Sequence, residues 1–248
     1  MILNKPFSSF QVDSLSKRWA AALLLLFAWG VSFMFLRFPP GEPDFSQFAY
    51  WMDDLSKAED YVTYYDAHPL RTVISSANLI YLGCFFLYIA FMHLVGLFYF
   101  TMYVCDLRKV PFSKAPKIYF TRIWWLILYS VTLCIPGLLA LGIFPFIYLF
   151  AIPAFYARPG LVLFDKMDVY KASLISAQKT RGHKFSIFLE LVVISMVYTA
   201  IHFIITQTLS AGSTGMFLVE AFLRSYIVLA IFRNMGARFH ILTAIKHE

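Results

Sequence analysis

The fold of this chain is decided by residues 72–105, which read TVISSANLIYLGCFFLYIAFMHLVGLFYFTMYVC and contain no Lys, Arg, Asp or Glu. A helix of a soluble protein keeps one face in water, so its charges recur every few residues. A run of 34 uncharged residues instead suits a helix that faces lipid on all sides. At about 1.5 Å per residue it would be about 51 Å long, against a hydrocarbon core of about 30 Å. It should therefore tilt and project beyond the bilayer, or bend near Gly83 or Gly96.

Further uncharged runs follow along the chain, in which only 14% of the 248 residues are charged, against about 25% in soluble domains. Charges taken as span limits predict six transmembrane helices, at about 19–36, 72–105, 121–141, 143–164, 185–208 and 215–233. Pro136-Gly137, Gly142 and Pro145 divide the third run into two spans. The prediction is an all-α, polytopic membrane protein with a single integral membrane domain over 1–248.

The basic residues sort to one side of this topology. Segments 1–18, 106–122, 158–184 and 233–248 fall on the same side of six spans, and together they carry 17 Lys and Arg against five Asp and Glu. The opposite side carries seven acidic residues, all in the loop 38–71, and three basic ones, which are Lys57 and Arg71 in that loop and Arg37 just before it. Because cytoplasmic loops carry an excess of Lys and Arg, both termini should be cytoplasmic. An odd number of spans would destroy this sorting.

The first span has the basic approach of a secretory signal, with Lys17 and Arg18 before Trp19. Its apolar part, 19–36, is longer than the h-region of about 7–15 residues that such signals carry. The exit at Arg37 to Pro40 offers no small-residue cleavage site. We therefore expect a retained first span.

The loop 38–71 is acidic and rich in aromatic residues, among them Phe45, Tyr50, Trp51 and Tyr64. This pattern is typical of a short amphipathic helix in the membrane interface, where aromatic rings prefer to lie. A binding surface for a cation or for a partner outside the cytoplasm is the alternative interpretation.

A second amphipathic segment lies between the fourth and fifth spans, at 165–184. Apolar residues alternate at helical spacing with basic ones, which are Lys166, Lys171, Lys179, Arg181 and Lys184. We expect a cytoplasmic surface helix, attracted to anionic lipid headgroups and ended by Gly182. Nucleic acid is not an expected partner, because topology alone explains the four dispersed basic segments.

An ordered series of signals runs through the middle of the chain. It comprises LRKVPFS at 107–113, IPG at 135–137, FAIP at 150–153, Asp165, YKASLIS at 170–176 and RGHKF at 181–185. Over about residues 107–185 the chain thereby resembles the YciC-like family of bacterial six-helix integral membrane proteins, which is related to the membrane domain of some glycerophosphodiester phosphodiesterases. The resemblance implies six spans and a cytoplasmic helix before the fifth span, in a bacterial inner membrane, with no transferable activity.

Apart from the residues already counted in the basic segments, three charged residues fall inside predicted spans, namely Glu190, Glu220 and Arg224. A charge at bilayer depth costs at least about 2.5–3.5 kcal/mol, so each needs a partner or a path to water. Glu220 and Arg224 are four residues apart and should pair on one helix face. The pair is interpreted either as structural or as part of a substrate, ion or lipid-headgroup site. Glu190 lies about 9 Å from Lys184 along the helix and would reach the cytoplasmic interface.

Two histidines also fall inside predicted spans. We expect a neighbouring hydroxyl or carbonyl to satisfy His93 and His202, while a proton relay through both is the sharper alternative. His202 is about 18 Å from Glu190 along the same helix, so those two should not touch.

Signatures of enzymes and cofactor sites are missing from the sequence. It has no phosphate-binding glycine loop, zinc-binding His/Glu pattern or nucleophile elbow, and Cys84, Cys105 and Cys134 fit neither a disulfide framework nor a metal site. We therefore expect no metal and no cofactor, and favour a non-enzymatic accessory or permease-like bundle that binds lipid, a solute, another membrane protein or a second copy. The alternative is an enzyme acting on a lipid or isoprenoid headgroup with Asp165, Asp168 and His183 at the cytoplasmic face.

Overall fold

A computed structural model describes residues 18–131 and 152–244, and this part of the chain is helical, with no strand. The all-α prediction is therefore confirmed for the described residues. Within these described residues, four helices are long and apolar enough to cross a membrane: α1 (Arg18–Arg37), α4 (Ser76–Leu107), α10 (Lys184–Thr208) and α11 (Thr214–Ala244). The shorter elements are α2 (Ser46–Lys57), α3 (Tyr61–Ala67), the 3-10 turn η3 (Leu70–Thr72), α5 (Lys114–Thr121), α8 (Arg158–Leu163) and α9 (Val169–Lys179).

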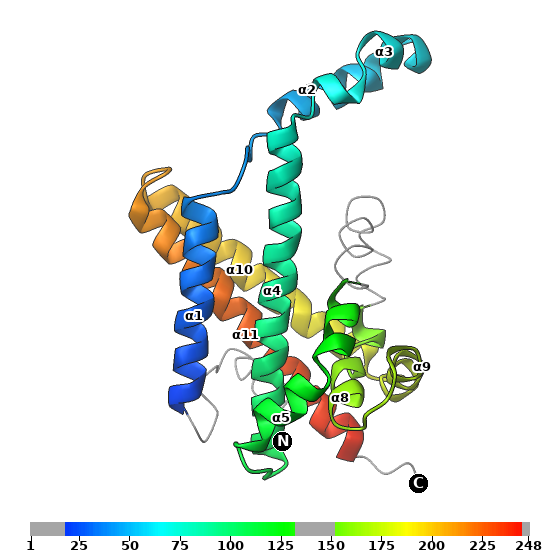
Figure 1. The fold of residues 1–248 in the computed structure, drawn as a ribbon, viewed down its shortest axis with the longest axis vertical. Helices are drawn as coiled ribbons and strands as arrows, with labels where there is room; N and C mark the ends of the chain where they lie inside the picture. The colour runs from blue at the N-terminus through cyan, green and yellow to red at the C-terminus, as the bar shows by residue number, and fades with distance from the viewer. Residues whose placement is uncertain (1–17, 132–151, 245–248) are drawn as a thin grey trace.

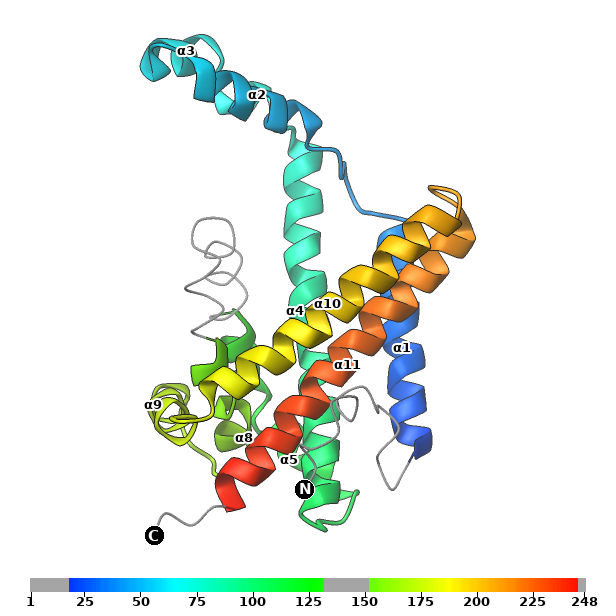
Figure 2. The same ribbon diagram turned by 180° about the vertical axis from the view of Figure 1, so that it is seen from behind.

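The four long helices form one bundle (Figure 1). α1 runs beside α11, and α10 and α11 form a hairpin that crosses α4 obliquely, which is also clear from behind (Figure 2). α4 is a single helix of 32 residues with no break at Gly83 or Gly96, so of the two expectations, projection beyond the bilayer fits better than bending. Exposed apolar side chains such as Leu23, Leu87 and Phe203 cover the outside of the bundle, as lipid contact requires.

Small residues allow α1 to approach α11 closely. Ala28 and Ser32 on α1, and Ala221 and Ser225 on α11, are each four residues apart and fully buried. The Ser32 hydroxyl lies 3.0 Å from Ser225 Oγ and 3.0 Å from the Tyr88 hydroxyl of α4. Small residues at this spacing, joined by hydroxyl hydrogen bonds, are a common way for helices to associate in lipid, where no hydrophobic force drives them together.

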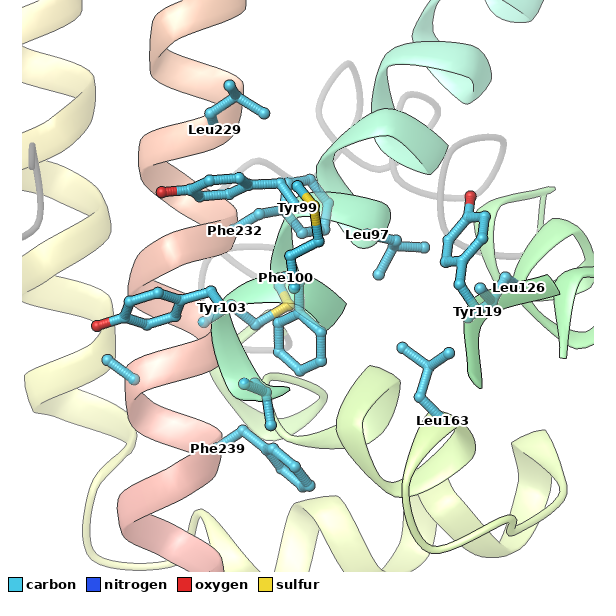
Figure 3. Close-up of a cluster of buried hydrophobic side chains, with 14 of the residues drawn as sticks. Leu97, Tyr99, Phe100, Tyr103, Tyr119, Leu126, Leu163, Leu229, Phe232 and Phe239 are labelled. Atoms are coloured by element: carbon cyan, nitrogen blue, oxygen red, sulfur yellow. The ribbon is translucent and has the colours of Figure 1, made fainter. Parts of the chain in front are cut away.

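The core lies between the second half of α4 and α11 (Figure 3). Tyr99, Phe100 and Tyr103 of α4 interdigitate with large side chains of α11, including Phe239. Gly96 faces the Phe232 ring, and a Cβ atom at this position would collide with that ring. The absence of a side chain at Gly96 is therefore what allows the two helices to come this close.

One end of the bundle gathers the basic segments, and we call it the basic end: the start of α1, the α4–α5 turn, α8, α9 and the end of α11 (Figure 1). Arg122 donates to the Lys166 carbonyl (3.1 Å), and Arg108 donates to Thr243 Oγ1 (2.9 Å). The segment from Arg122 to Lys166 therefore starts and finishes at the same end of the molecule.

The loop 38–71 contains two helices rather than the one that was expected, and it leaves the opposite end of the bundle. Asn78, in the first turn of α4, donates to the carbonyls of Glu42 and Asp44 (2.9 Å each) and so ties the loop to α4. Beyond this tie α2 and α3 extend away from the other helices and pack on each other around Trp51 (Figure 2).

The predicted span limits hold at some positions and fail at others. α1 and α10 match 19–36 and 185–208 within a residue, and α4 covers most of 72–105. The predicted last span, 215–233, ends before its helix does, because α11 continues to Ala244 and buries Arg233, Asn234 and Arg238. The spans 121–141 and 143–164 lie partly outside the described residues: 123–131 is helical, and the chain from 152 is interrupted by a turn at 155–157 before α8.

Candidate functional site

A cavity of about 750 Å³ lies between α4, α10 and α11. Most of its wall is apolar, as at Phe85 and Met92 of α4, Leu191 of α10 and Met235 of α11. Tyr156, which precedes α8, adds to the wall. Because all three helices are of membrane-spanning length and composition, a cavity between their middle turns is suited to an apolar guest.

The first polar group on this wall belongs to the Glu220 cluster, which consists of Tyr198 and His202 on α10 and Glu220 and Arg224 on α11. Arg224 Nε donates to Glu220 Oε1 (2.8 Å), so the predicted pairing of these two residues is confirmed. Tyr198 donates to the same oxygen (3.1 Å), and His202 Nδ1 lies 2.8 Å from Oε2. The carboxylate is buried, whereas a third of the Arg224 side chain is exposed. Tyr198 and Arg224 face the cavity.

The partners of Glu220 define the state of the cluster. An ionised carboxylate can only accept hydrogen bonds, so the contact with His202 requires the proton on Nδ1. The sequence-based expectation that a hydroxyl or carbonyl satisfies His202 is therefore wrong, because its partner is a carboxylate. A buried carboxylate with three donors, one of them a guanidinium, is well compensated for its loss of water.

A second polar network joins the same two helices nearer the basic end. Glu190 of α10 accepts from Arg238 Nε (3.0 Å) and Asn234 Nδ2 (2.9 Å), and a terminal nitrogen of Arg238 also contacts its other oxygen. That nitrogen also donates to Ser186 Oγ (2.6 Å). Asn234 in turn accepts from the Tyr156 hydroxyl (2.7 Å). Glu190 therefore pairs with α11, and this contact replaces the expected route to the cytoplasmic interface.

His93 lies on the cavity wall between the two networks. Its ring contacts those of Tyr129 and Phe232, with centroids 5.3 and 4.9 Å away. Its Nε2 is buried and has no hydrogen-bond partner within the described part of the chain. The expected hydroxyl or carbonyl partner is thus not seen there, and His93 and His202 belong to separate groups of contacts.

The predicted surface candidates lie around α9 at the basic end. The side chains of Asp165, Asp168, Lys171, Arg181 and Lys184 are exposed, whereas Lys179 and His183 are partly buried. Asp168 accepts from the Lys171 N–H (2.8 Å) and so caps α9. Gly182 has a φ of +86° in the connection to α10, where a residue without Cβ is favoured. The observed geometry gives Asp168 a role in helix capping.

Sequence reasoning did not find Tyr198, Tyr156, Asn234 or Arg238. Tyr198 precedes His202 by four residues and Asn234 precedes Arg238 by four, so helical spacing placed each pair on one face. The extent of α11 was the missing information for Asn234 and Arg238. No sequence pattern signals the contact of Tyr156 with Asn234, because 78 residues separate them.

Among residues 18–131 and 152–244, no three His, Cys, Asp or Glu side chains are arranged to hold a metal ion. The site therefore offers hydrogen-bonding and ionic groups beside an apolar cavity. Compared with protein-family models, with curated proteins and with solved structures, the chain has no match.

Proposed function

We propose that this chain is a non-enzymatic integral membrane protein whose bundle binds a lipid or a small amphiphilic solute in the cavity between α4, α10 and α11. The observation that carries the proposal is the cavity itself, which is largely apolar and has Tyr198 and Arg224 on its wall. Ligand pockets commonly combine an apolar wall with a few polar groups that orient the guest.

The proposal includes six spans with both termini in the cytoplasm of a bacterial cell. It is supported by the gathering of the basic segments at one end and by the acidic loop at the other (Figure 1). Membership of the YciC-like family belongs to the same proposal and rests on the order of signals between 107 and 185.

The enzymatic alternative is tested by substitution at the surface candidates. It requires Asp165 or His183 for activity, whereas cavity binding requires neither. The side chain of Asp165 is exposed, and Asp168 caps α9. Helix capping explains the presence of Asp168 without any catalytic role, which favours the binding proposal.

A pair of valines on α11 allows a direct test of cavity binding. Val228 lines the cavity, whereas Val219 is 43% exposed on the outside of the same helix. We expect Val228→Phe to fill the space, and Val219→Phe to leave it open. After purification in mild detergent, mass spectrometry should find a co-purifying lipid or solute with wild type and Val219→Phe and much less with Val228→Phe. Equal content in both variants, at similar melting temperatures, would refute the proposal.

A further inference from the structure

The two ends of the cavity differ in the polar groups that they offer to a guest. Near the basic end, Tyr156 donates to Asn234, and Arg238 and Asn234 donate to Glu190. The polar groups of this network are therefore hydrogen-bonded to one another. Phe232 and Met235 line the cavity in this region, which therefore suits a hydrocarbon tail.

The other end presents a charge to the cavity. The guanidinium of Arg224 has five N–H donors in a planar fork, of which Nε–H is given to Glu220. Arg224 is a third exposed and lines the cavity, whereas Glu220 is buried behind it. A guest therefore meets the arginine and not the glutamate, and a fork of this shape matches carboxylate and phosphate oxygens.

We propose that the ligand is an anionic single-chain amphiphile, with its carboxylate or phosphate at Arg224 and its chain directed along α11 toward Phe232 and Met235. Met235 follows Arg224 by 11 positions, which correspond to about 16 Å along the helix, and this length accommodates an extended segment of an acyl chain. This inference rests on the proposed function and adds to it the chemical class and the orientation of the guest.

The charge of Arg224 on the cavity wall favours an anionic head over a neutral or cationic one. A cation would be repelled by Arg224, and a neutral alcohol would gain no ionic contact with it. The buried, unpartnered Nε2 of His93 lies beside Phe232, eight residues and about 12 Å from Arg224 along α11. An imidazole nitrogen in that position is left for water or a guest inside the cavity.

The test compares ligands that share a chain and differ in the head. Oleate and oleyl alcohol would be titrated against the full chain in phosphatidylcholine nanodiscs, by displacement of a fluorescent fatty acid. We expect wild type to prefer oleate by about 10-fold. The double variant Glu220→Gln/Arg224→Gln, which removes both charges and leaves neither unpaired, should lose this preference. Arg37→Gln, an arginine outside the cavity lining, should keep it.

The outcomes separate this inference from the proposed function. If Val228→Phe abolishes binding of both ligands but wild type binds them equally, the cavity site stands and the anionic head is refuted. If the preference survives in the double variant, the assignment to Arg224 is refuted. A further titration with oleoyl lysophosphatidate identifies the source of the anion: tighter binding than oleate indicates a lipid phosphate, and weaker binding a free fatty acid.

Discussion

The Glu220 carboxylate lies in a buried position at the α10–α11 contact, where Arg224, Tyr198 and His202 all approach it. The three partners are not equivalent, because only Arg224 carries a permanent charge. Removing the carboxylate leaves that guanidinium without its counterion. Removing Arg224 instead leaves the carboxylate with two partners from α10. Removing Glu220 and removing Arg224 should therefore lower the free energy of unfolding by different amounts.

We expect Glu220→Ala to lower the free energy of unfolding by about 3 kcal/mol, because it leaves a partly buried charge uncompensated. Arg224→Ala should cost less, about 1–2 kcal/mol, since Tyr198 and His202 still donate to Glu220. Thermal unfolding in detergent measures both, with Glu220→Gln as the control that keeps an acceptor. A larger loss for Arg224→Ala than for Glu220→Ala would show that the guanidinium has other essential partners.

Asp60 outside the bundle gives a prediction for pH. The Thr63 hydroxyl (2.6 Å) and the Val62 N–H (3.0 Å) donate to its carboxylate and lower its pKa below the ordinary value of about 4. The charged cap therefore stabilises α3 above about pH 4, and this contribution is lost as the pH falls through the lowered pKa.

The ¹⁹F signal of fluorotryptophan at Trp51, which packs on α3, should report this loss. We expect it to shift below about pH 4 in wild type and to stay constant over that range in Asp60→Asn, which keeps a capping side chain without a titrating group. An identical acid shift in Asp60→Asn would assign the transition to another group.

The residues of the site show how far sequence reasoning reaches. Glu220 and Arg224 are four apart on one helix, so local spacing was sufficient to predict their contact. The contacts of Glu220 with Tyr198 and His202 depend on the register between α10 and α11. A single sequence contains no signal for that register, which packing of the two helices determines.

At the scale of helices, two glycines of α4 have opposite surroundings. A Cβ at Gly96 would collide with the Phe232 ring, whereas one at Gly83 would meet nothing within 4 Å. We expect Gly96→Ala to destabilise the bundle by about 1–3 kcal/mol, because close packing leaves no room for a methyl group. Gly83→Ala should be neutral or stabilising by up to about 1 kcal/mol, because alanine favours the helix.

The same melting experiment can test the cause at Gly96. Combining Gly96→Ala with Phe232→Leu should recover part of the loss, because the smaller side chain provides room for the added methyl group. If Gly83→Ala and Gly96→Ala lower the melting temperature equally, the close approach of α4 and α11 at this position would be contradicted.

The end of α11 shows why the sequence limits of helices can mislead. Charges predict a span end on the assumption that they seek water, and Arg233 lies at the predicted end of the last span. In the structure Arg233, Asn234 and Arg238 are buried in the same helix, where Arg238 pairs with Glu190 and Arg233 lies over the Tyr103 ring. A charge with a partner on another helix does not need water, so it does not end a helix.

At the scale of the whole molecule, the sorting of charges does not depend on whether the chain crosses the membrane four or six times. Arg122 bonds to the Lys166 carbonyl, so the segment between them returns to the end from which it started. Any membrane crossings between these two residues are therefore even in number. The sorting of charges therefore cannot by itself fix the number of spans.

Labelling of single cysteines from each side of the membrane tests both the orientation and the number of spans. Ser56 on α2 and Lys171 on α9 are exposed at opposite ends of the bundle, so Ser56→Cys should react only from outside and Lys171→Cys only from the cytoplasm. Gly142→Cys, at the predicted turn between the third and fourth spans, should react from outside if the chain has six spans. The background needs Ala at Cys84, Cys105 and Cys134. If Ser56→Cys reacts from the cytoplasm, the orientation is the reverse of the proposed one, because the acidic and basic ends of the bundle lie on opposite sides of the membrane. If Gly142→Cys reacts from the cytoplasm, the chain has four crossings instead of six. The orientation is then unchanged, because the loss of two spans leaves every other segment on its own side.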